Sequence, residues 1–293
     1  MSRSNILIIL ALLLAACGPK VLEPDAAFEC TNCERWNLPQ APFRVYGNTW
    51  YVGTAGLSSL LIETADGLIL IDGALPQSAA LIDANIRKLG FDPLQISAIF
   101  LSHAHYDHAG GIASLQRLSG AIVYTSDAGR AVLESGELQS DDPQYNNHLE
   151  GSGVPVVSNV VVMADRETVL IGGLDVLAIH TPGHAPGGMS WSWESCALDT
   201  CYDVVYADSM TAVSATGYRF SDGPAANQLI ESADALSNLD CDILLSPHPF
   251  FFGMQDKLER TDDGNPFINN VACMIYAESA LDWLQQRLQS EGG

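Results

Sequence analysis

The chain carries little positive charge. Its 293 residues include 13 Lys and Arg against 35 Asp and Glu, which gives a formal net charge of −22. Such a surface repels a phosphate backbone, so no binding to nucleic acid is expected. The composition is 47% hydrophobic and only 16% charged. It therefore excludes a disordered polyelectrolyte and provides enough apolar residues for a large core.

The apolar run near the N-terminus is too short to cross a bilayer. Residues 6–16 are about 11 uninterrupted apolar positions after Arg3, which fits the apolar region of a signal peptide. The small residues before Cys17 resemble a bacterial lipobox, and Gly18 is typical of an outer-membrane address. We predict a signal peptide over residues 1–16, lipid attachment at Cys17, and a periplasmic protein tethered to the outer membrane. An ordinary secretory signal cleaved nearby is the alternative.

The chain has seven cysteines, an odd number that is awkward in an exported protein. Lipid attachment at Cys17 leaves an even six. Their proximity in sequence suggests three disulfides, although other pairings remain open: Cys30 with Cys33, Cys196 with Cys201, and Cys241 with Cys273. A four-thiolate zinc site from the first two pairs is the alternative, but an oxidising periplasm favours disulfides. A thioredoxin-like role for residues 30–33 needs a strand before them and a helix after them, and the polar sequence around them predicts neither.

The order of the expected strands and helices predicts an α/β fold with two halves of similar plan. The expected elements are strands between 43 and 71, a helix at 78–89, a strand at 96–101, a helix at 112–118, a strand at 121–125, a strand-rich stretch from about 156 to 179, a strand at 204–207, a helix at 224–239, a strand at 243–245, and a last helix with Ala277, Leu281, Leu284 and Leu288 on one face. Each half begins with strands and then alternates helices and strands. This order suits two β-sheets packed face to face with helices outside.

No linker interrupts the later sequence, so we expect residues 42–293 to form one domain. Residues 17–41 are polar and contain prolines, and we expect them to be a tether and an N-terminal segment. A long polar loop lies between residues 138 and 155. Loops of this length are usually functional or mobile.

Potential metal ligands are concentrated directly after the expected strand at 96–101. Four of them, His103, His105, Asp107 and His108, occupy six consecutive positions. Histidine is the commonest neutral metal ligand, and aspartate adds an anionic oxygen. One ion cannot easily take all four ligands from so tight a loop. Two adjacent metal ions are therefore expected to divide them.

Two further histidines also follow expected strands. His184 comes after the strand-rich stretch, and His248 comes after the strand at 243–245. Because active sites collect residues from separate parts of the chain at strand ends, we expect both to join the first cluster. His148 lies in the polar loop and is expected to be solvated. His180 is expected to have a structural or supporting role.

The sequence 103–108, His-Ala-His-Tyr-Asp-His, resembles the HxHxDH motif of the metallo-β-lactamase superfamily. Asp72-Gly73, Pro182-Gly183-His184 and the later His248 match the family pattern in the same order. The resemblance implies a four-layer αβ/βα sandwich with two Zn²⁺ ions at its edge. It assigns the first zinc to His103, His105 and His184, and the second to Asp107, His108 and His248. It also makes Asp72 the acid that steadies the histidine loop.

The stretch 206–211 distinguishes the branches of the superfamily. Two β-lactamase subclasses place a zinc-binding cysteine about here, and this sequence has none. Lactonases and glyoxalase II-type thioester hydrolases place a bridging aspartate here, for which Asp208 is the candidate. Ala207-Asp208-Ser209-Met210 resembles the third subclass of the class B β-lactamases, as do Trp36-Asn37-Leu38-Pro39 and the pair Cys241 and Cys273. Because adjacent residues of an extended segment point oppositely, we expect Ser209 to face the metals and Asp208 to be structural.

The resemblance implies a zinc-dependent β-lactamase that confers antibiotic resistance. Water activated by the metals would open the β-lactam amide of penicillins, cephalosporins and carbapenems, so the absence of a Gly-x-Ser-x-Gly or Ser-x-x-Lys motif is expected. We expect Asp107 and Tyr218 to be catalytic, and Ser209, Thr211 and Gln144 to contact the substrate. The alternative is a lactonase or thioester hydrolase. A monomer is favoured.

Overall fold

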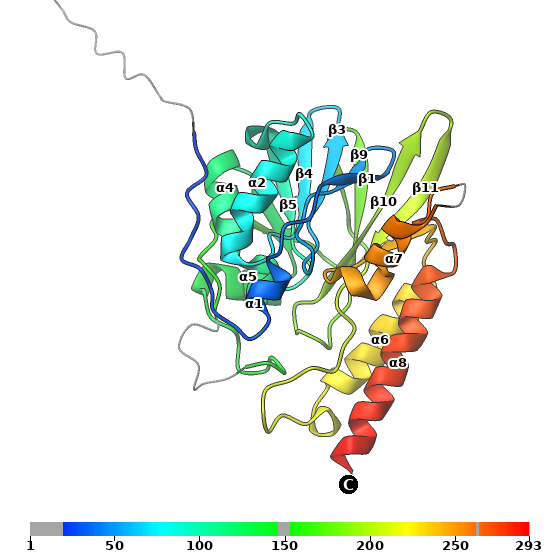
Figure 1. The fold of residues 1–293 in the computed structure, drawn as a ribbon. Helices are drawn as coiled ribbons and strands as arrows, with labels where there is room; N and C mark the ends of the chain where they lie inside the picture. Colours follow the sequence, from blue (N-terminus) through cyan, green and yellow to red (C-terminus); the bar gives the residue numbers. More distant parts are fainter. Residues whose placement is uncertain (1–19, 146–152, 262–263, 293) are drawn as a thin grey trace, which may run out of the picture.

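A computed structural model describes residues 20–145, 153–261 and 264–292. The expected signal segment, Cys17 and His148 lie outside the described residues. Two β-sheets pack face to face, and helices cover the outer face of each sheet (Figure 1). This arrangement confirms the predicted αβ/βα sandwich.

The first sheet contains, in the described part of the chain, seven strands in sequential order. The first four strands are antiparallel, and the strands from β4 to β7 run parallel. Their bounds are β1 Phe43–Tyr46, β2 Thr49–Tyr51, β3 Leu60–Thr64, β4 Gly67–Ile71, β5 Ile96–Phe100, β6 Ile122–Thr125 and β7 Val160–Val162. The parallel strands end at one edge of the sheet, and the chain leaves β5 there to enter the histidine motif.

The second sheet has the order β12-β11-β10-β9-β8. Its strands are antiparallel except for the parallel pair of β11 and β12. Their bounds are β8 Thr168–Ile171, β9 Leu174–His180, β10 Met189–Ala197, β11 Thr200–Tyr206 and β12 Ile243–Leu245. The ends of β9, β11 and β12 lead into the segments that carry His184, residues 207–211 and His248.

The helices vary in length from a single turn to 20 residues. Their bounds are α1 Cys33–Trp36, α2 Ala79–Lys88, α3 Tyr106–Ala109, α4 Ile112–Ser119, α5 Asp127–Ser135, α6 Ala225–Ser237, α7 Met254–Glu259 and α8 Ala272–Glu291, with 3₁₀ turns η1 Pro76–Ser78, η2 Pro93–Gln95, η3 Phe220–Asp222 and η4 Pro249–Phe252. Helices α2, α4 and α5 lie on the side of the first sheet, and α6 and α8 lie on the side of the second (Figure 1). Among the described helices, none has both the length and the apolar character of a membrane span.

Strand β4 shows why the chain forms layers. Ile69 and Ile71 face the core between the two sheets, while Leu68 and Leu70 face the core beneath the helices of the first layer. All four are almost fully buried. Because successive side chains of a strand point to opposite faces, a continuous apolar run is required where both faces are covered.

The N-terminal segment from residue 20 follows the helices of the first layer rather than extending away from them (Figure 1). Arg117 of α4 contacts Asp25 at 2.9 Å, and the ring of Phe28 stacks on that of Tyr106 at 4.0 Å. Three disulfides join Cys30 to Cys33, Cys196 to Cys201, and Cys241 to Cys273. The pairing suggested by sequence proximity is therefore the one in the structure, and the four-thiolate zinc site is excluded.

Candidate metal centre and active site

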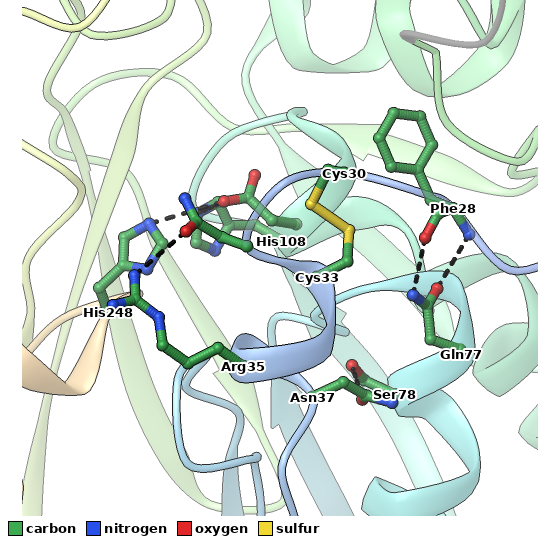
Figure 2. The surroundings of a disulfide bond; sticks show 11 residues. Phe28, Cys30, Cys33, Arg35, Asn37, Gln77, Ser78, His108 and His248 are labelled. Carbon is green, nitrogen blue, oxygen red and sulfur yellow. Dashed lines mark hydrogen bonds and ion pairs between the residues drawn. A yellow bond between two sulfur atoms is a disulfide. The ribbon is translucent and has the colours of Figure 1, made fainter.

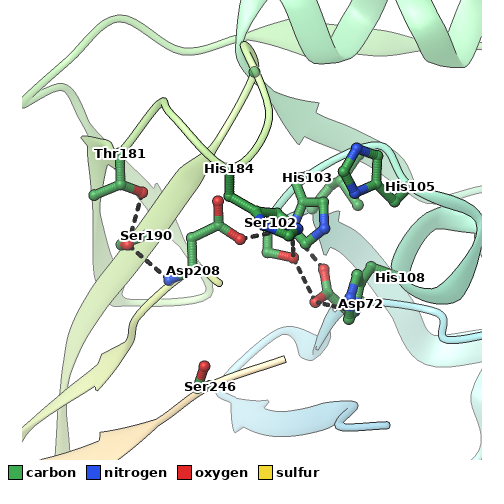
Figure 3. A network of polar contacts seen from close by, with 12 residues as sticks. Asp72, Ser102, His103, His105, His108, Thr181, His184, Ser190, Asp208 and Ser246 are labelled. Carbon is green, nitrogen blue, oxygen red and sulfur yellow. Dashed lines mark hydrogen bonds and ion pairs between the residues drawn. The ribbon is translucent and has the colours of Figure 1, made fainter. Parts of the chain in front are cut away.

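The six predicted metal ligands converge from three separate segments of the chain. His103 and His105 follow β5, and Asp107 and His108 lie on the short helix α3. His184 follows β9, and His248 follows β12. Figure 3 shows the side chains of His103, His105, His108 and His184 gathered at the edge of the sandwich. The fold therefore brings together residues that are up to 145 positions apart in the sequence.

The six side chains form two adjoining groups. In the described part of the chain, the potential ligand atoms of His103, His105 and His184 all lie within 4.8 Å of one another, and so do those of His103, Asp107 and His108. His248 adjoins the second group, because its Nε2 lies 3.6 Å from Oδ2 of Asp107. Such spacing suits metal coordination better than direct hydrogen bonding.

Four of the five imidazoles are held by the ring nitrogen that points away from the centre. Nδ1 of His103 donates to Oδ1 of Asp208 at 2.7 Å, and Nε2 of His105 donates to Asp142 at 3.0 Å. Nδ1 of His184 donates to the carbonyl of Thr211, and Nδ1 of His248 donates to the carbonyl of Gly56. A donor on one nitrogen leaves the lone pair on the other, so each of these rings offers its unprotonated nitrogen to the centre.

Buried ring nitrogens without a hydrogen-bond partner are the clearest sign of a metal site. Among the described residues, Nε2 of His103 and both ring nitrogens of His108 are buried without a hydrogen-bond partner. Buried polar atoms are normally paired, so such orphaned lone pairs require another partner. Burial lowers the pKa of His184 to about 3, and burial together with the neighbouring imidazoles holds the pKa of His103 and His108 well below the usual value. Neutral imidazoles are the form that binds a metal.

His105 differs from the other ligands in its electrostatics. Burial lowers its pKa, but the charge and the hydrogen bond of Asp142 outweigh this effect and raise the pKa above the usual value. Both oxygens of Asp142 lie within 3.1 Å of Nε2 of His105. The ring is thereby fixed with Nδ1 toward the centre.

Asp72 steadies the loop that carries the histidines. Its carboxylate accepts hydrogen bonds from the backbone N–H and the hydroxyl of Ser102 (Figure 3). It also accepts one from the hydroxyl of Tyr206, and all three are 2.7–2.8 Å long. Nδ1 of His108 lies 3.9 Å from it, too far for a hydrogen bond. Burial raises the pKa of Asp72 and of Asp208 to about 7. Asp72 therefore has the position that the sequence predicts, acting on the loop through Ser102.

Asp208 lies behind His103 and does not join the metal-ligand groups of the described residues. Its Oδ1 bonds Nδ1 of His103, and its backbone N–H donates to Ser190 (Figure 3). The hydroxyl of Ser209 is buried without a hydrogen-bond partner in the described structure. The structural role expected for Asp208 is thus a specific one: it orients His103. The direct contact of Ser209 with a substrate stays a prediction.

Comparison with known proteins places this geometry in a family. Residues 53–248 match the model of the metallo-β-lactamase superfamily. The chain belongs to this superfamily. Two solved structures resemble it over most of its length. The Rm3 metallo-β-lactamase is 42% identical with a TM-score of 0.87 and covers 90% of this chain and 100% of its own. MEM-A1, a subclass B3 metallo-β-lactamase from a soil metagenome library, is 43% identical with a TM-score of 0.84 and covers 88% and 98%.

Curated relatives are more distant. An N-acyl homoserine lactonase from a Bacillus species is 26% identical over 153 residues, which is 44% of this chain and 55% of the lactonase. The chain spans between 32% and 61% of the length of the first curated relatives that it matches. The superfamily is one of metal-binding hydrolases, and the structural neighbours lie in its subclass B3.

A cavity of about 600 Å³ opens over the metal centre of this superfamily member. Predicted residues Gln144 and Thr211 line it. Nε2 of Gln144 donates to His105 and His184 at 3.3 Å, and the carbonyl and hydroxyl of Thr211 both contact His184. Polar residues of the metal centre form one part of the lining, and the apolar part includes Trp36, Val213, Phe250, Phe251 and Trp283.

Tyr218 is a predicted catalytic residue that the structure does not bring to this cavity lining. Its ring packs edge-on against Phe220 at 5.3 Å, and its carbonyl accepts a hydrogen bond from Arg287. Packing of the ring into the loop before η3 explains the difference. Tyr218 therefore has a structural environment, and the oxyanion role predicted for it receives no support.

Several residues at the site were not identified from the sequence. Asp142 lies in the polar loop, whose length was the only signal. Arg287 of α8 and Asn32 of the N-terminal segment also line the cavity, but they lie outside the segments that carry the predicted metal ligands. No spacing rule connects them to the histidine motif, because only the folded chain places them together. His180 has an environment consistent with the structural role expected for it, since its Nε2 donates a hydrogen bond to the carbonyl of Met163.

Proposed function

We propose that the protein is a dizinc β-lactamase that hydrolyses the β-lactam amide and confers resistance to these antibiotics. His103, His105 and His184 would hold the first ion, and Asp107, His108 and His248 the second. The observation that carries the proposal is the cluster of buried imidazoles, four of which are fixed by a hydrogen-bond partner on the ring nitrogen that points away from the centre. Five imidazoles and one carboxylate are donors that suit zinc.

Bound zinc supplies Lewis acidity, which lowers the pKa of water and polarises carbonyl groups. The chain itself orients the ligands through Asp208, Asp142, Thr211 and Gly56. The aromatic side chains on the cavity walls lower the local polarity beside them, which strengthens electrostatic interactions there. The described site contains no serine or cysteine nucleophile among the residues that line the cavity.

The cavity suits a small anionic substrate despite the charge of −22. Its volume of about 600 Å³ lies in the range of small-molecule sites. Arg287 is the one guanidinium among the residues that line the cavity, and the two metal ions would add local positive charge. A β-lactam carboxylate can therefore enter a site whose surroundings are acidic. Solved relatives named SMB-1 carry the small thiols 2-mercaptoethanesulfonate and mercaptoacetic acid, which are also anionic.

Two observations favour a β-lactam over a lactone or thioester. The structural neighbours are β-lactamases at 42–43% identity, whereas the lactonase relative is 26% identical. Asp208, the candidate for the bridging aspartate of the other branches, instead bonds the outward nitrogen of His103. A lactonase is the second candidate, supported by that curated relative.

A hydrolysis assay tests the proposal. Purified protein loaded with zinc is expected to open a penicillin and a carbapenem, and a chelator is expected to stop both reactions. Serine-directed inhibitors are expected to have no effect. Turnover of a homoserine lactone or a glutathione thioester with none of either β-lactam would favour the second candidate. Absence of turnover of all of these would reject both candidates.

We also propose that the protein is exported to the periplasm and held at the outer membrane by lipid on Cys17. The lipobox-like sequence before Cys17 supports this proposal, and the three disulfides suit an oxidising compartment. Mass spectrometry of the protein extracted from membranes is expected to find an acylated N-terminal Cys17. A mature N-terminus elsewhere, or an unmodified cysteine, would contradict it.

A further inference from the structure

The N-terminal segment forms one wall of the cavity. Asn32 and Trp36 line the cavity, and the ring of Trp36 lies 5.3 Å from that of His248. Both residues belong to the turn and single-turn helix that the Cys30–Cys33 disulfide closes. Figure 2 shows this disulfide on the segment that passes beside His108 and His248. A cavity-lining side chain, Asn32, therefore lies inside the four-residue loop of a disulfide.

The segment is anchored to the domain on both sides of this disulfide. Before it, the backbone N–H and carbonyl of Phe28 exchange two hydrogen bonds with the side-chain amide of Gln77 (Figure 2). After it, the carbonyl of Trp36 accepts hydrogen bonds from the hydroxyl of Thr54 and the N–H of Gly56. Between the two anchors, the disulfide and the hydrogen bonds of the turn determine where Asn32 lies.

Hydrogen bonds connect this wall of the cavity to His248, one of the predicted metal ligands. Gly56 donates its N–H to Trp36 and accepts a hydrogen bond from Nδ1 of His248 on its carbonyl. A Cβ at position 56 would lie 2.6 Å from Cα of Trp36, so the two segments are in direct backbone contact. The turn of Asn32 is thus placed relative to His248 through one glycine.

We infer that Asn32 binds the substrate and contributes to specificity, and that the Cys30–Cys33 disulfide positions it. The inference rests on the proposed function. Oδ1 of Asn32 accepts a hydrogen bond from Arg35 at 3.2 Å. The side-chain amide nitrogen of Asn32 is therefore the group that can donate a hydrogen bond to a ligand. The matching group is a hydrogen-bond acceptor, a carboxylate or an amide carbonyl, on the part of the β-lactam that lies near His248.

The Cys30–Cys33 disulfide is better explained by its effect on the position of the turn than by a contribution to the stability of the whole fold. A bridge between residues three positions apart closes too short a loop to restrict the unfolded chain strongly. Cys33 is buried and Cys30 is half-buried, with the cavity-lining residue between them. Removal of the bridge frees the backbone of the turn, while the anchors at Phe28 and Trp36 keep the segment on the domain.

The chain offers a matched control in Cys196–Cys201. This disulfide also closes a short loop, with a sequence separation of five, in the exposed hairpin between β10 and β11. Neither cysteine lines the cavity in the described structure. Its loss is expected to change the unfolded chain about as much as loss of Cys30–Cys33, without changing a wall of the site.

The test compares three variants of the zinc-loaded protein: Cys30→Ser with Cys33→Ser, Cys196→Ser with Cys201→Ser, and Asn32→Ala. Substitution is used instead of a thiol reductant because thiols bind zinc. KM and kcat are measured for a penicillin and a carbapenem, together with metal content and melting temperature. The first and third variants are expected to raise KM about fivefold, the effect of one lost hydrogen bond, with kcat and metal content unchanged. Combining them is expected to add little further.

Three outcomes would overturn the inference: an unchanged KM in the Cys30/Cys33 variant, an unchanged KM in Asn32→Ala, or an equal rise in the Cys196/Cys201 control. Failure of the unmodified protein to open any β-lactam rejects the proposed function instead. In that case hydrogen exchange still tests the positioning. The amide of Trp36, which donates to the carbonyl of Asn32 within the turn, is expected to exchange faster in the Cys30/Cys33 variant only, while the amide of Gly56 at the anchor keeps its protection. Equal protection of the Trp36 amide in all variants would overturn that step.

Discussion

Oδ1 of Asp208 lies 2.7 Å from Nδ1 of His103, and both side chains are fully buried. The opposite nitrogen of the same ring, Nε2, is buried without a partner in the described structure. Asp208 therefore contacts the predicted metal ligand His103 on the side of the ring opposite the metal centre. This relationship separates two roles that the sequence alone leaves together, those of a bridging ligand and of an orienting carboxylate.

Replacing Asp208 with alanine is expected to weaken zinc binding about 10- to 100-fold while leaving the maximum number of bound ions unchanged. The ring of His103 loses the acceptor that fixes its tautomer. Competition with a chromophoric chelator measures the affinity, and Asp107→Ala is the comparison, because it removes a direct ligand. Loss of one ion per chain in Asp208→Ala at saturating zinc would show that Asp208 is itself a ligand.

Asp142 is expected to do for His105 what Asp208 does for His103. Asp142→Ala removes both carboxylate contacts to Nε2 of His105 and is expected to lower zinc affinity at the group of His103, His105 and His184 by about 10- to 100-fold. The neighbouring Asp141 is exposed and provides the control, Asp141→Ala. Equal zinc affinity in the two variants, measured by the same chelator competition, would refute the role of Asp142.

Zinc is expected to stabilise the fold as well as to serve catalysis. Nε2 of His103 and one of the two unpartnered ring nitrogens of His108 gain a partner when a metal ion binds. At a free zinc concentration of about 100 times Kd, linkage gives about 2.7 kcal/mol, which raises the melting temperature of a chain this size by roughly 5–10 °C. Calorimetry across a zinc titration measures the shift. A melting temperature that does not respond to zinc or to a chelator contradicts a metal site here.

The metal ligands are recognisable in the sequence because few residue types bind zinc and because four of them lie within six positions. The fold class follows from the order of strands and helices, and the boundaries of α2, β5 and β12 are close to those predicted. Strand β10 was not identified, although Trp191, Trp193 and Ser195 alternate toward the interior as a strand requires. Leu281 of α8 is 40% exposed, unlike Ala277 and Leu284, so the predicted apolar face is narrower than the sequence suggests.

The outer parts of the site depend on contacts that no local pattern encodes. Asp142 reaches His105 across 37 residues, and Asn32 reaches the cavity from the segment before the first sheet. Tyr218 shows the converse case: its place in a motif suggests a catalytic role, but its ring packs against Phe220 and its carbonyl accepts a hydrogen bond from Arg287, so its catalytic role stays a prediction. Sequence patterns therefore predict the ligands themselves, whereas the orienting groups and cavity walls require the three-dimensional packing.

The end of α8 is fastened to the loop before α6 by one carboxylate. Glu291 accepts hydrogen bonds from the backbone N–H of Phe220 and of Ser221 and from Nε of Arg287, at 2.7–2.9 Å. Arg287 in turn donates to Ser214 and to the carbonyl of Tyr218. Although burial alone would raise the pKa of Glu291, these hydrogen bonds outweigh it and lower the pKa to about 2. The carboxylate thus supports the wall of the cavity that contains Val213 and Arg287.

Replacing Glu291 with glutamine is expected to lower the free energy of unfolding at pH 7 by about 1–2 kcal/mol, because hydrogen bonds to a charged acceptor are replaced by weaker ones. The folded-state pKa lies below the unfolded value, so this stabilisation is complete above about pH 5 and disappears as the pH falls toward 2. Urea unfolding of both proteins between pH 7 and pH 3 measures the difference. Glu278→Gln, at an exposed position of the same helix, is the control. A difference between Glu291→Gln and the unmodified protein that stays constant across this range would show that the carboxylate charge is not what holds the loop.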